Sequence, residues 1–327
     1  MTESTRPLIA ISRSAMPGDP AARLSAVADI RLWPKRTYPS RAELAELSAG
    51  AVALLCVNGD PIDVEFMARC PDLRLIALAS TGYDSVNVEA ADRQGVAVTH
   101  SRGTLHETTA DLTFGLILAA RRRIVEGDRY VRAGKWTHND LDLLLGHDVY
   151  GATIGIVGYG QIGQAVARRA TGFGMTIVHH RRQRGDDQHS RWMELDDLLR
   201  LSDVVTLHVP SNPTTRHYIG ERELRLMKPT ATLVNAARGA VLDEVALGRA
   251  LREGWIGSAG LDVQQQEPNP DPEDPLLGIP TCVVLPHLGS ATLAARERMI
   301  GLAVDNIVAF LEGRDLLTPI GGPAAAR

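Results

Sequence analysis

One strand-turn-helix sequence constrains the fold of this chain more than any other feature. An apolar, mostly β-branched run over residues 153–157 breaks into Gly158-Tyr159-Gly160-Gln161-Ile162-Gly163, and a helix-forming sequence follows. In that context Gly158 permits a tight turn, Gly160 admits a pyrophosphate to the backbone, and Gly163 lets the helix pack on the strand. The first N–H groups of the helix would then face the phosphates. The motif therefore predicts a dinucleotide site, with an ordinary strand-to-helix turn as the alternative.

Apolar strands alternate with helical segments along the rest of the chain. This rhythm predicts the α/β class, with two doubly wound, parallel-sheet (Rossmann-like) domains. Parallel sheets bind ligands beyond the carboxyl ends of their strands. Two loops at such ends, Val57-Asn58-Gly59 and Ser80-Thr81-Gly82, could hold a small anion through backbone N–H groups, although plain turns explain them equally well.

A long helix is predicted over residues 104–124. Thr104 and Glu107 match a capping box at its start, and Arg121-Arg122-Arg123 would lie at its end, where a run of arginines is usually solvated. Residues 125–150 are expected to form an irregular arm that leads to the next strand.

Composition excludes several classes of function. The chain has 327 residues, of which 44% are hydrophobic and 23% charged, as in an ordinary globular protein. Its formal net charge of −4 gives no general attraction to nucleic acid or anionic membranes, and no run approaches the roughly 18 apolar residues of a membrane span. Cys56, Cys70 and Cys282 form no metal-ligand or disulfide pattern. We therefore expect a cytoplasmic protein with no metal, no nucleic-acid partner and no membrane association.

Arg238, Glu267 and His287 each follow a predicted strand in the second half of the chain. We expect these strands to end at the same edge of the sheet as the glycine turn. A histidine exchanges protons near neutral pH, a neighbouring carboxylate favours its protonated form, and an arginine fork binds carboxylates. Together with a hydride-carrying cofactor, this set is what reduction of a 2-keto acid needs. Taken singly, each residue could instead be structural.

The chain resembles the D-isomer-specific 2-hydroxyacid dehydrogenases over nearly its whole length. Within that family, the run 146–151 is most similar to glyoxylate/hydroxypyruvate reductases and to 2-ketogluconate reductases. Besides the glycine motif, the resemblance rests on the segments 80–84, 109–111, 227–229, 235–239, 259–263, 267–268 and 286–292.

The resemblance implies a role for each site residue. His287 would be the general acid that protonates the keto oxygen, with Glu267 paired to it, and Arg238 would bind the substrate carboxylate. The further substrate contacts implied are the backbone at Asn58, Gly59, Thr81 and Gly82. The further cofactor contacts implied are Val209, Pro210, Thr215, Ala236, Gly289 and Asp262, the last on the nicotinamide carboxamide.

The resemblance also implies a discontinuous layout. A substrate domain of residues 1–102 plus 292–327 would enclose a nucleotide-binding domain of residues 103–291, with the active-site cleft between them. Two copies would form a homodimer through residues 104–150. Many relatives carry Asn-Thr-Pro-Gly at the first crossing, where this chain has His100-Ser101-Arg102-Gly103.

A basic run beyond the second nucleotide-binding strand bears on the choice of cofactor. NAD enzymes place an acid there, about 20 residues past the glycines, whereas this chain has His179-His180-Arg181-Arg182-Gln183-Arg184. Arginines hold a 2′-phosphate that an acid would repel. We expect NADPH to be preferred, with NADH possible and with Arg181 and Arg182 as the main contacts. A basic surface loop is the alternative.

These observations predict NADPH-dependent reduction of small 2-keto acids, such as glyoxylate or hydroxypyruvate, to D-2-hydroxy acids. Two alternatives remain at this point. One is a dehydrogenase of the same family with another substrate, such as 2-ketogluconate. The other is a non-catalytic, nucleotide-sensing scaffold on the same fold, which could keep the same three residues. A formate dehydrogenase is disfavoured because that branch resembles a Gln–His pair where Glu267 stands.

Overall fold

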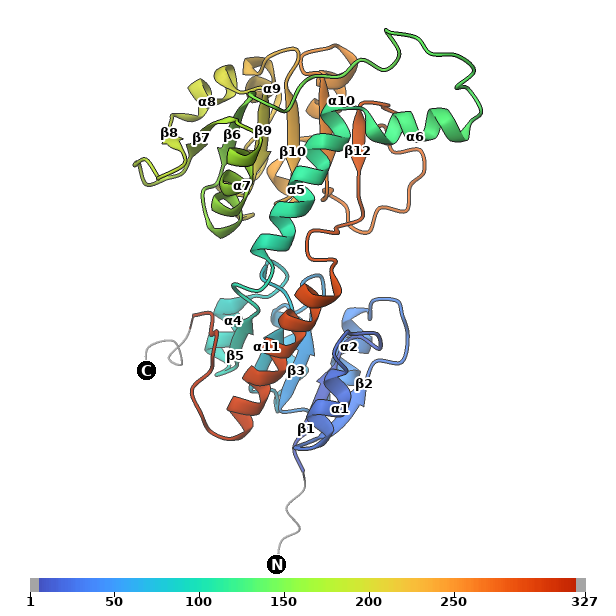
Figure 1. Ribbon diagram of the computed structural model, residues 1–327. Helices are drawn as coiled ribbons and strands as arrows, with labels where there is room; N and C mark the ends of the chain where they lie inside the picture. Colours follow the sequence, from blue (N-terminus) through green and yellow to red (C-terminus); the bar gives the residue numbers. More distant parts are fainter. Residues whose placement is uncertain (1–5, 322–327) are drawn as a thin grey trace, which may run out of the picture. The chain divides into compact units, whose positions relative to one another are not determined.

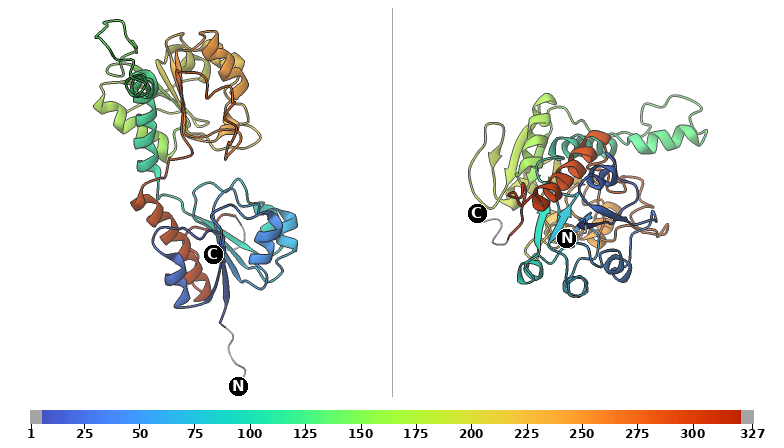
Figure 2. Two further views of the ribbon diagram at one scale, coloured as in Figure 1. Left: turned by 90° about the vertical axis from the view of Figure 1, so that its right-hand side faces the viewer. Right: turned by 90° about the horizontal axis from the view of Figure 1, so that it is seen from below.

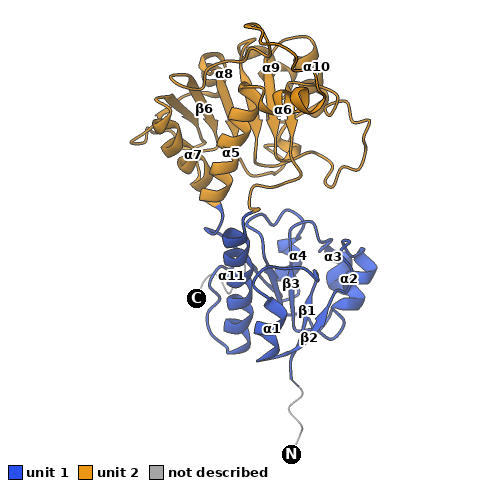
Figure 3. Ribbon diagram, turned by 45° about the vertical axis from the view of Figure 1, so that its right-hand side comes forward, with its two compact units in different colours: residues 1–105, 292–327 blue, residues 106–291 orange. Residues whose placement is uncertain are grey.

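A computed structural model describes residues 6–321 of the chain. The chain divides into two compact units, unit 1 (Met1–Leu105 with Thr292–Arg327) and unit 2 (His106–Ala291), which Figure 3 distinguishes by colour. The first crossing between the units follows Leu105, whereas the predicted layout placed it after residue 102.

Unit 1 contains a parallel five-stranded sheet in the order β2-β1-β3-β4-β5. Helices cover both faces, because the inner strands are apolar on both sides. The strands are β1 (Leu8–Ile11), β2 (Asp29–Leu32), β3 (Ala53–Cys56), β4 (Leu75–Leu78) and β5 (Ala97–His100). One face packs on α1 (Pro20–Ser25) and α11 (Leu293–Leu311), and the other on α2 (Arg41–Leu47), α3 (Val64–Ala68) and α4 (Val88–Arg93) (Figure 1).

Unit 2 contains a parallel seven-stranded sheet in the order β12-β11-β10-β9-β6-β7-β8. Its strands are β6 (Thr153–Val157), β7 (Thr176–His180), β8 (Arg191–Trp192), β9 (Val204–Leu207), β10 (Thr232–Asn235), β11 (Ser258–Leu261) and β12 (Cys282–Val284). One face packs on α5 (His106–Arg121) and α7 (Gln161–Gly172). The other packs on α8 (Leu195–Leu201), α9 (Glu221–Leu226) and α10 (Glu244–Arg252). The predicted class of two parallel, doubly wound sheets is confirmed.

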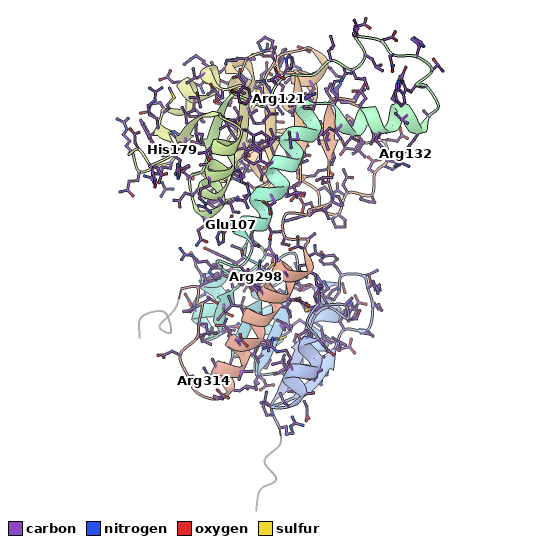
Figure 4. The ribbon with its side chains drawn as sticks, in the orientation of Figure 1. Glu107, Arg121, Arg132, His179, Arg298 and Arg314 are labelled. Atoms are coloured by element: carbon purple, nitrogen blue, oxygen red, sulfur yellow. The ribbon has the colours of Figure 1, made fainter. Side chains whose placement is uncertain are left out.

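The two ends of α5 differ from the sequence prediction. Glu107 is not part of a capping box, because its carboxylate pairs with Arg168 and Arg169 on α7. The hydroxyl of Thr104 donates instead to the Ser101 carbonyl, at 2.8 Å. Figure 4 labels Glu107 and Arg121 at opposite ends of this helix.

The guanidinium of Arg121 is buried rather than solvated. Its Nε donates to the Asp148 carbonyl at 2.7 Å, and its Nη1 donates to the Asp203 carbonyl at 2.9 Å and to the Thr230 carbonyl at 3.2 Å. Arg121 therefore joins the end of α5 to three segments that are distant in the sequence.

The predicted irregular arm begins with a helix, α6 (Ile124–Arg132). None of the residues of α6 is buried, and the helix projects from the rest of unit 2 (Figure 2). Exposed apolar side chains continue along the arm at Ile124, Val131, Trp136, Leu141 and Leu145. Within residues 6–321, no helix is both long and apolar enough to cross a bilayer.

Candidate active site

The glycine turn after β6 leaves room for an anion. At Gly158 φ is +96°, and a Cβ there would lie 2.5 Å from the His208 carbonyl carbon. A Cβ at Gly163 would lie 2.3 Å from the Gly158 oxygen, so both positions require glycine. At Gly160 nothing lies within 4 Å, and no side chain caps the start of α7. The free N–H groups and the open backbone fit a dinucleotide pyrophosphate.

The sheet order puts this turn at the topological switch point of unit 2. The strand β6 lies between β7 and β9, so successive connections from it run to opposite sides of the sheet. The loop after β9 is closed by Thr215, whose hydroxyl donates to the Pro210 carbonyl at 2.6 Å and accepts the Asn212 N–H at 2.9 Å. Of the other predicted contacts at strand ends, Ala236 is buried and Val209 is half-buried.

His287 and Glu267 form a direct pair. The Nδ1 of His287 lies 2.6 Å from Glu267 Oε2, and Glu267 Oε1 accepts the Gln264 N–H at 2.8 Å. Burial by itself would raise the pKa of Glu267, but the hydrogen bond and charge of His287 outweigh it, so this pKa is lowered. The His287 side chain is 46% exposed, which leaves its ring open to a ligand.

The loop that carries His287 is anchored by Asp262, at the end of β11. Its two carboxylate oxygens accept the N–H groups of Leu288 at 2.7 Å and Gly289 at 2.8 Å, and its carbonyl accepts the His287 N–H at 2.9 Å. Burial raises the pKa of Asp262. On the other side of the loop, the Thr109 hydroxyl donates to the Gly289 carbonyl at 3.0 Å. These bonds hold His287 at φ +54°, a backbone conformation that is unusual for a residue with a side chain.

Arg238 lies on a turn that Asn235 braces from inside the protein. The buried Asn235 amide accepts the Ala237 N–H at 3.0 Å and donates to the Arg238 carbonyl at 2.9 Å. The next residue, Gly239, packs so closely that a Cβ would lie 2.0 Å from the carbonyl carbon of Gln264. The turn that carries Arg238 therefore packs against the segment that carries Glu267, and the charge of Arg238 contributes to the lowered pKa of Glu267.

The three arginines of the basic run differ in what they contact. Arg181 donates to two carbonyls of its own loop, those of Gln183 at 3.1 Å and Gly185 at 3.2 Å. Arg184 is paired with Glu194. Arg182 is exposed, and within residues 6–321 it has no hydrogen bond or ion pair.

The predicted anion loops of unit 1 are not equivalent. The N–H of Asn58 donates to Ser80 Oγ at 3.2 Å, and that of Gly59 donates to Ser85 Oγ at 3.1 Å. In the part of the chain that the structure describes, the N–H groups of Thr81 and Gly82 have no acceptor.

His208 was missed by the sequence analysis, although it directly follows β9 at the glycine turn. Its Nε2 lies 2.9 Å from the Thr206 hydroxyl oxygen. Its Nδ1 is buried and has no hydrogen-bond partner among residues 6–321. Burial lowers the pKa of His208 to about 3, so the ring is neutral near pH 7. The sequence signal that could have pointed to His208 was its position directly after an apolar strand, where side chains of a parallel sheet face a ligand.

Comparison with known proteins agrees with this geometry. A family model described as D-isomer specific 2-hydroxyacid dehydrogenase, NAD binding domain, matches residues 114–289. A glyoxylate reductase of Korarchaeum cryptofilum (strain OPF8) is 47% identical over 292 residues, 87% of each chain. Another glyoxylate reductase, from Aeropyrum pernix, is 42% identical over 317 residues, 94% of each chain.

Two solved structures extend the similarity to the whole fold. A protein of Thermus thermophilus is 43% identical with a TM-score of 0.91, covering 96% of this chain and 100% of that chain. An NADPH-dependent glyoxylate/hydroxypyruvate reductase of Sinorhizobium meliloti, solved with NADP and malonate, is 30% identical with a TM-score of 0.87, covering 97% of each chain. The chain thus belongs to the D-isomer-specific 2-hydroxyacid dehydrogenase family and is an oxidoreductase with an NAD(P)-binding unit.

Proposed function

We propose that this enzyme reduces small 2-keto acids, glyoxylate and hydroxypyruvate among them, to D-2-hydroxy acids, with NADPH preferred over NADH. The observation that carries the proposal is the 2.6 Å pair of His287 and Glu267. The relatives named glyoxylate reductase support the choice of substrate class.

His287 is the proposed general acid. When bound, the reduced nicotinamide supplies the hydride that reaches the carbonyl carbon of the substrate. The protonated His287 ring gives the proton on Nε2 to the carbonyl oxygen, because Nδ1 is held by Glu267. Glu267 remains a carboxylate throughout, as its lowered pKa favours. It orients the ring and stabilises the protonated form that the reaction consumes.

Arg238 is the proposed contact for the substrate carboxylate, since its planar fork can donate two parallel hydrogen bonds. We also propose the N–H groups of Thr81 and Gly82 as carboxylate donors, because they lack an acceptor of their own among residues 6–321. Asn58 and Gly59 are weaker candidates, since their N–H groups already donate to serine hydroxyls.

The preference for NADPH rests on Arg182 first and Arg181 second. All the donors of Arg182 are available to a 2′-phosphate, whereas Arg181 shares its donors with loop carbonyls. The wider set of proposed cofactor contacts is the glycine motif with Val209, Pro210, Thr215, Ala236, Asp262 and Gly289.

A second copy of the chain is the proposed partner of the arm. No residue of α6 is buried, and Ile124, Val131 and Trp136 are more than half exposed, at 54%, 53% and 59%. A homodimer would cover this apolar surface. Light scattering of the purified protein tests it, with the mass of two chains expected and the mass of one chain contradicting it.

A panel of 2-keto acids, assayed with NADPH and NADH separately, tests the proposed activity. We expect the highest kcat/KM for glyoxylate or hydroxypyruvate with NADPH. Arg182→Ala should raise KM for NADPH about tenfold and leave that for NADH unchanged, since one charged contact is lost. The matched control is Arg184→Ala, which removes an arginine already paired with Glu194. Equal use of both cofactors by the unaltered enzyme, or no turnover of any keto acid, would contradict the proposal.

A further inference from the structure

The loop after β7 carries two acids beside its arginines, and the glycine motif itself contacts one of them. The Tyr159 hydroxyl donates to Asp187 Oδ1 at 3.0 Å. The Tyr159 ring is 4% exposed and is stacked on His179 of β7, with ring centroids 4.0 Å apart. Figure 4 labels His179 on this edge of unit 2. The stacking therefore fixes the position of the Tyr159 ring, and with it the position of the hydroxyl that donates to Asp187.

Both acids of the loop are engaged by donors of the protein. Besides the tyrosine, Asp187 Oδ1 accepts the His189 N–H at 3.2 Å, while Asp186 Oδ1 accepts the Trp192 N–H at 2.7 Å. Two backbone hydrogen bonds join Asp187 to Ser190, at 2.9 and 3.2 Å. The Ser190 hydroxyl oxygen in turn lies 2.8 Å from His179 Nδ1. The side chains of Tyr159 and Asp187 thus connect the glycine turn to the loop.

The same tyrosine lies close to one of the basic side chains, Arg181. The guanidinium carbon of Arg181 is 5.9 Å from the centroid of the Tyr159 ring. An acid of this loop whose carboxylate reached the Arg181 guanidinium would compete with a bound phosphate for the donors of Arg181 and would repel the phosphate. A carboxylate that is held by a neutral hydroxyl and a backbone N–H competes less for the guanidinium and repels the phosphate less, because these donors already stabilise its charge.

We propose that Tyr159 determines cofactor specificity by holding the Asp187 carboxylate away from the donors of Arg181 and Arg182, which leaves those donors to the 2′-phosphate. This inference rests on the proposed preference for NADPH. Tyr159 would act through Asp187, whereas the arginines would touch the phosphate directly.

Calorimetric binding of adenosine 2′,5′-bisphosphate and of 5′-AMP to the full-length protein tests the proposal, because the two probes differ only in the 2′-phosphate. Tyr159→Phe keeps the ring stacked on His179 and removes the hydroxyl. We expect it to weaken the bisphosphate about fivefold and to change 5′-AMP by less than about twofold. Asp187→Asn in the Tyr159→Phe background should restore bisphosphate binding, whereas Asp186→Asn should not. The exposed Tyr150→Phe is the matched control.

Several results would overturn the role of Tyr159. They are equal weakening of both probes, unchanged binding of the bisphosphate, or failure of Asp187→Asn to rescue. Asp187→Glu, on the exposed loop, provides a second variant that moves the carboxylate past the hydroxyl and should weaken the bisphosphate selectively. If the unaltered protein binds both probes equally, the proposed NADPH preference fails. The role of Tyr159 is still tested in that case, because the ratio of the two affinities in Tyr159→Phe is compared with the ratio in the unaltered protein.

Discussion

The Nδ1 of His287 lies 2.6 Å from a Glu267 oxygen, and the second oxygen of that carboxylate is already bound to the Gln264 N–H. Because Glu267 is an acceptor on both oxygens, the proton between the two side chains belongs to His287 Nδ1. The other ring nitrogen, Nε2, is then the one through which the proposed proton transfer would run.

The first prediction concerns the charge of Glu267. Glu267→Gln can still accept from Nδ1 but no longer brings a negative charge to the ring, so His287 should be a weaker proton donor. We expect kcat for glyoxylate to fall by at least about tenfold, while binding of NADPH stays within about twofold. Glu273→Gln, an exposed acid on the same loop, is the control and should keep the unaltered kcat. An unchanged kcat in Glu267→Gln would remove the glutamate from the mechanism.

The second prediction concerns Asn235, whose side chain braces the turn that carries Arg238. Asn235→Ala removes both hydrogen bonds that shape the turn. We expect KM for the keto acid to rise about tenfold, since loss of two buried hydrogen bonds loosens the arginine. Fluorescence titration should show unchanged binding of NADPH. Asn235→Asp keeps the acceptor for the Ala237 N–H, so its KM for the keto acid should lie between those of the unaltered enzyme and Asn235→Ala. A lower kcat with an unchanged KM would indicate general destabilisation instead.

The third prediction follows from the neutral ring of His208. Burial lowers its pKa in the folded state to about 3, whereas the ordinary value is 6.5. As the pH falls below 6.5 the unfolded chain takes up a proton that the folded chain does not, so this residue destabilises the fold increasingly down to about pH 3. His208→Gln should therefore reduce the loss of unfolding free energy between pH 6 and 4 by up to about 1.4 kcal/mol per pH unit.

Urea denaturation at several pH values measures this difference. The exposed His138→Gln is the control and should follow the unaltered protein. Parallel pH dependence in His208→Gln and the unaltered protein would contradict a ring that stays neutral.

The fourth prediction concerns stability at the end of α5. Arg121→Met removes the guanidinium donor from the carbonyls of Asp148 and Thr230 and one of the two donors to the Asp203 carbonyl, which should cost about 2–4 kcal/mol of unfolding free energy. Arg122→Met, at the exposed neighbouring position, should cost less than about 0.5 kcal/mol. Equal costs in the two variants would show that the carbonyl contacts do not stabilise the fold.

Sequence alone predicted the features that depend on local pattern. The glycine turn and the strands that precede Arg238, Glu267 and His287 all lie in short, strongly apolar runs, so the parallel sheet of unit 2 could be predicted. The edge strand β2 (Asp29–Leu32) could not be predicted in this way, because it buries little of its surface and carries no such run.

Contacts between distant segments could not be predicted in the same way. Arg121 meets the Asp203 and Thr230 carbonyls across 82 and 109 residues, and the adjacent arginines 122 and 123 give no sign of it. Glu107 matches a capping box in sequence, but Arg168 and Arg169 offer charged partners that a backbone N–H cannot rival. The Tyr159–Asp187 hydrogen bond belongs to the same class, since only the fold of the loop after β7 brings the two residues together.

The central claim is that His287 supplies the proton that reduction needs. His287→Asn keeps a polar side chain on the loop but cannot act as an acid, so kcat for glyoxylate should fall by about 10²–10⁴-fold. The dissociation constant of NADPH, measured by fluorescence titration, should stay within about twofold of that of the unaltered enzyme. This control shows that the variant is folded and still binds its cofactor. Turnover of glyoxylate by His287→Asn is the most direct test. The predicted loss would support the account, and near-normal turnover with NADPH bound would contradict it.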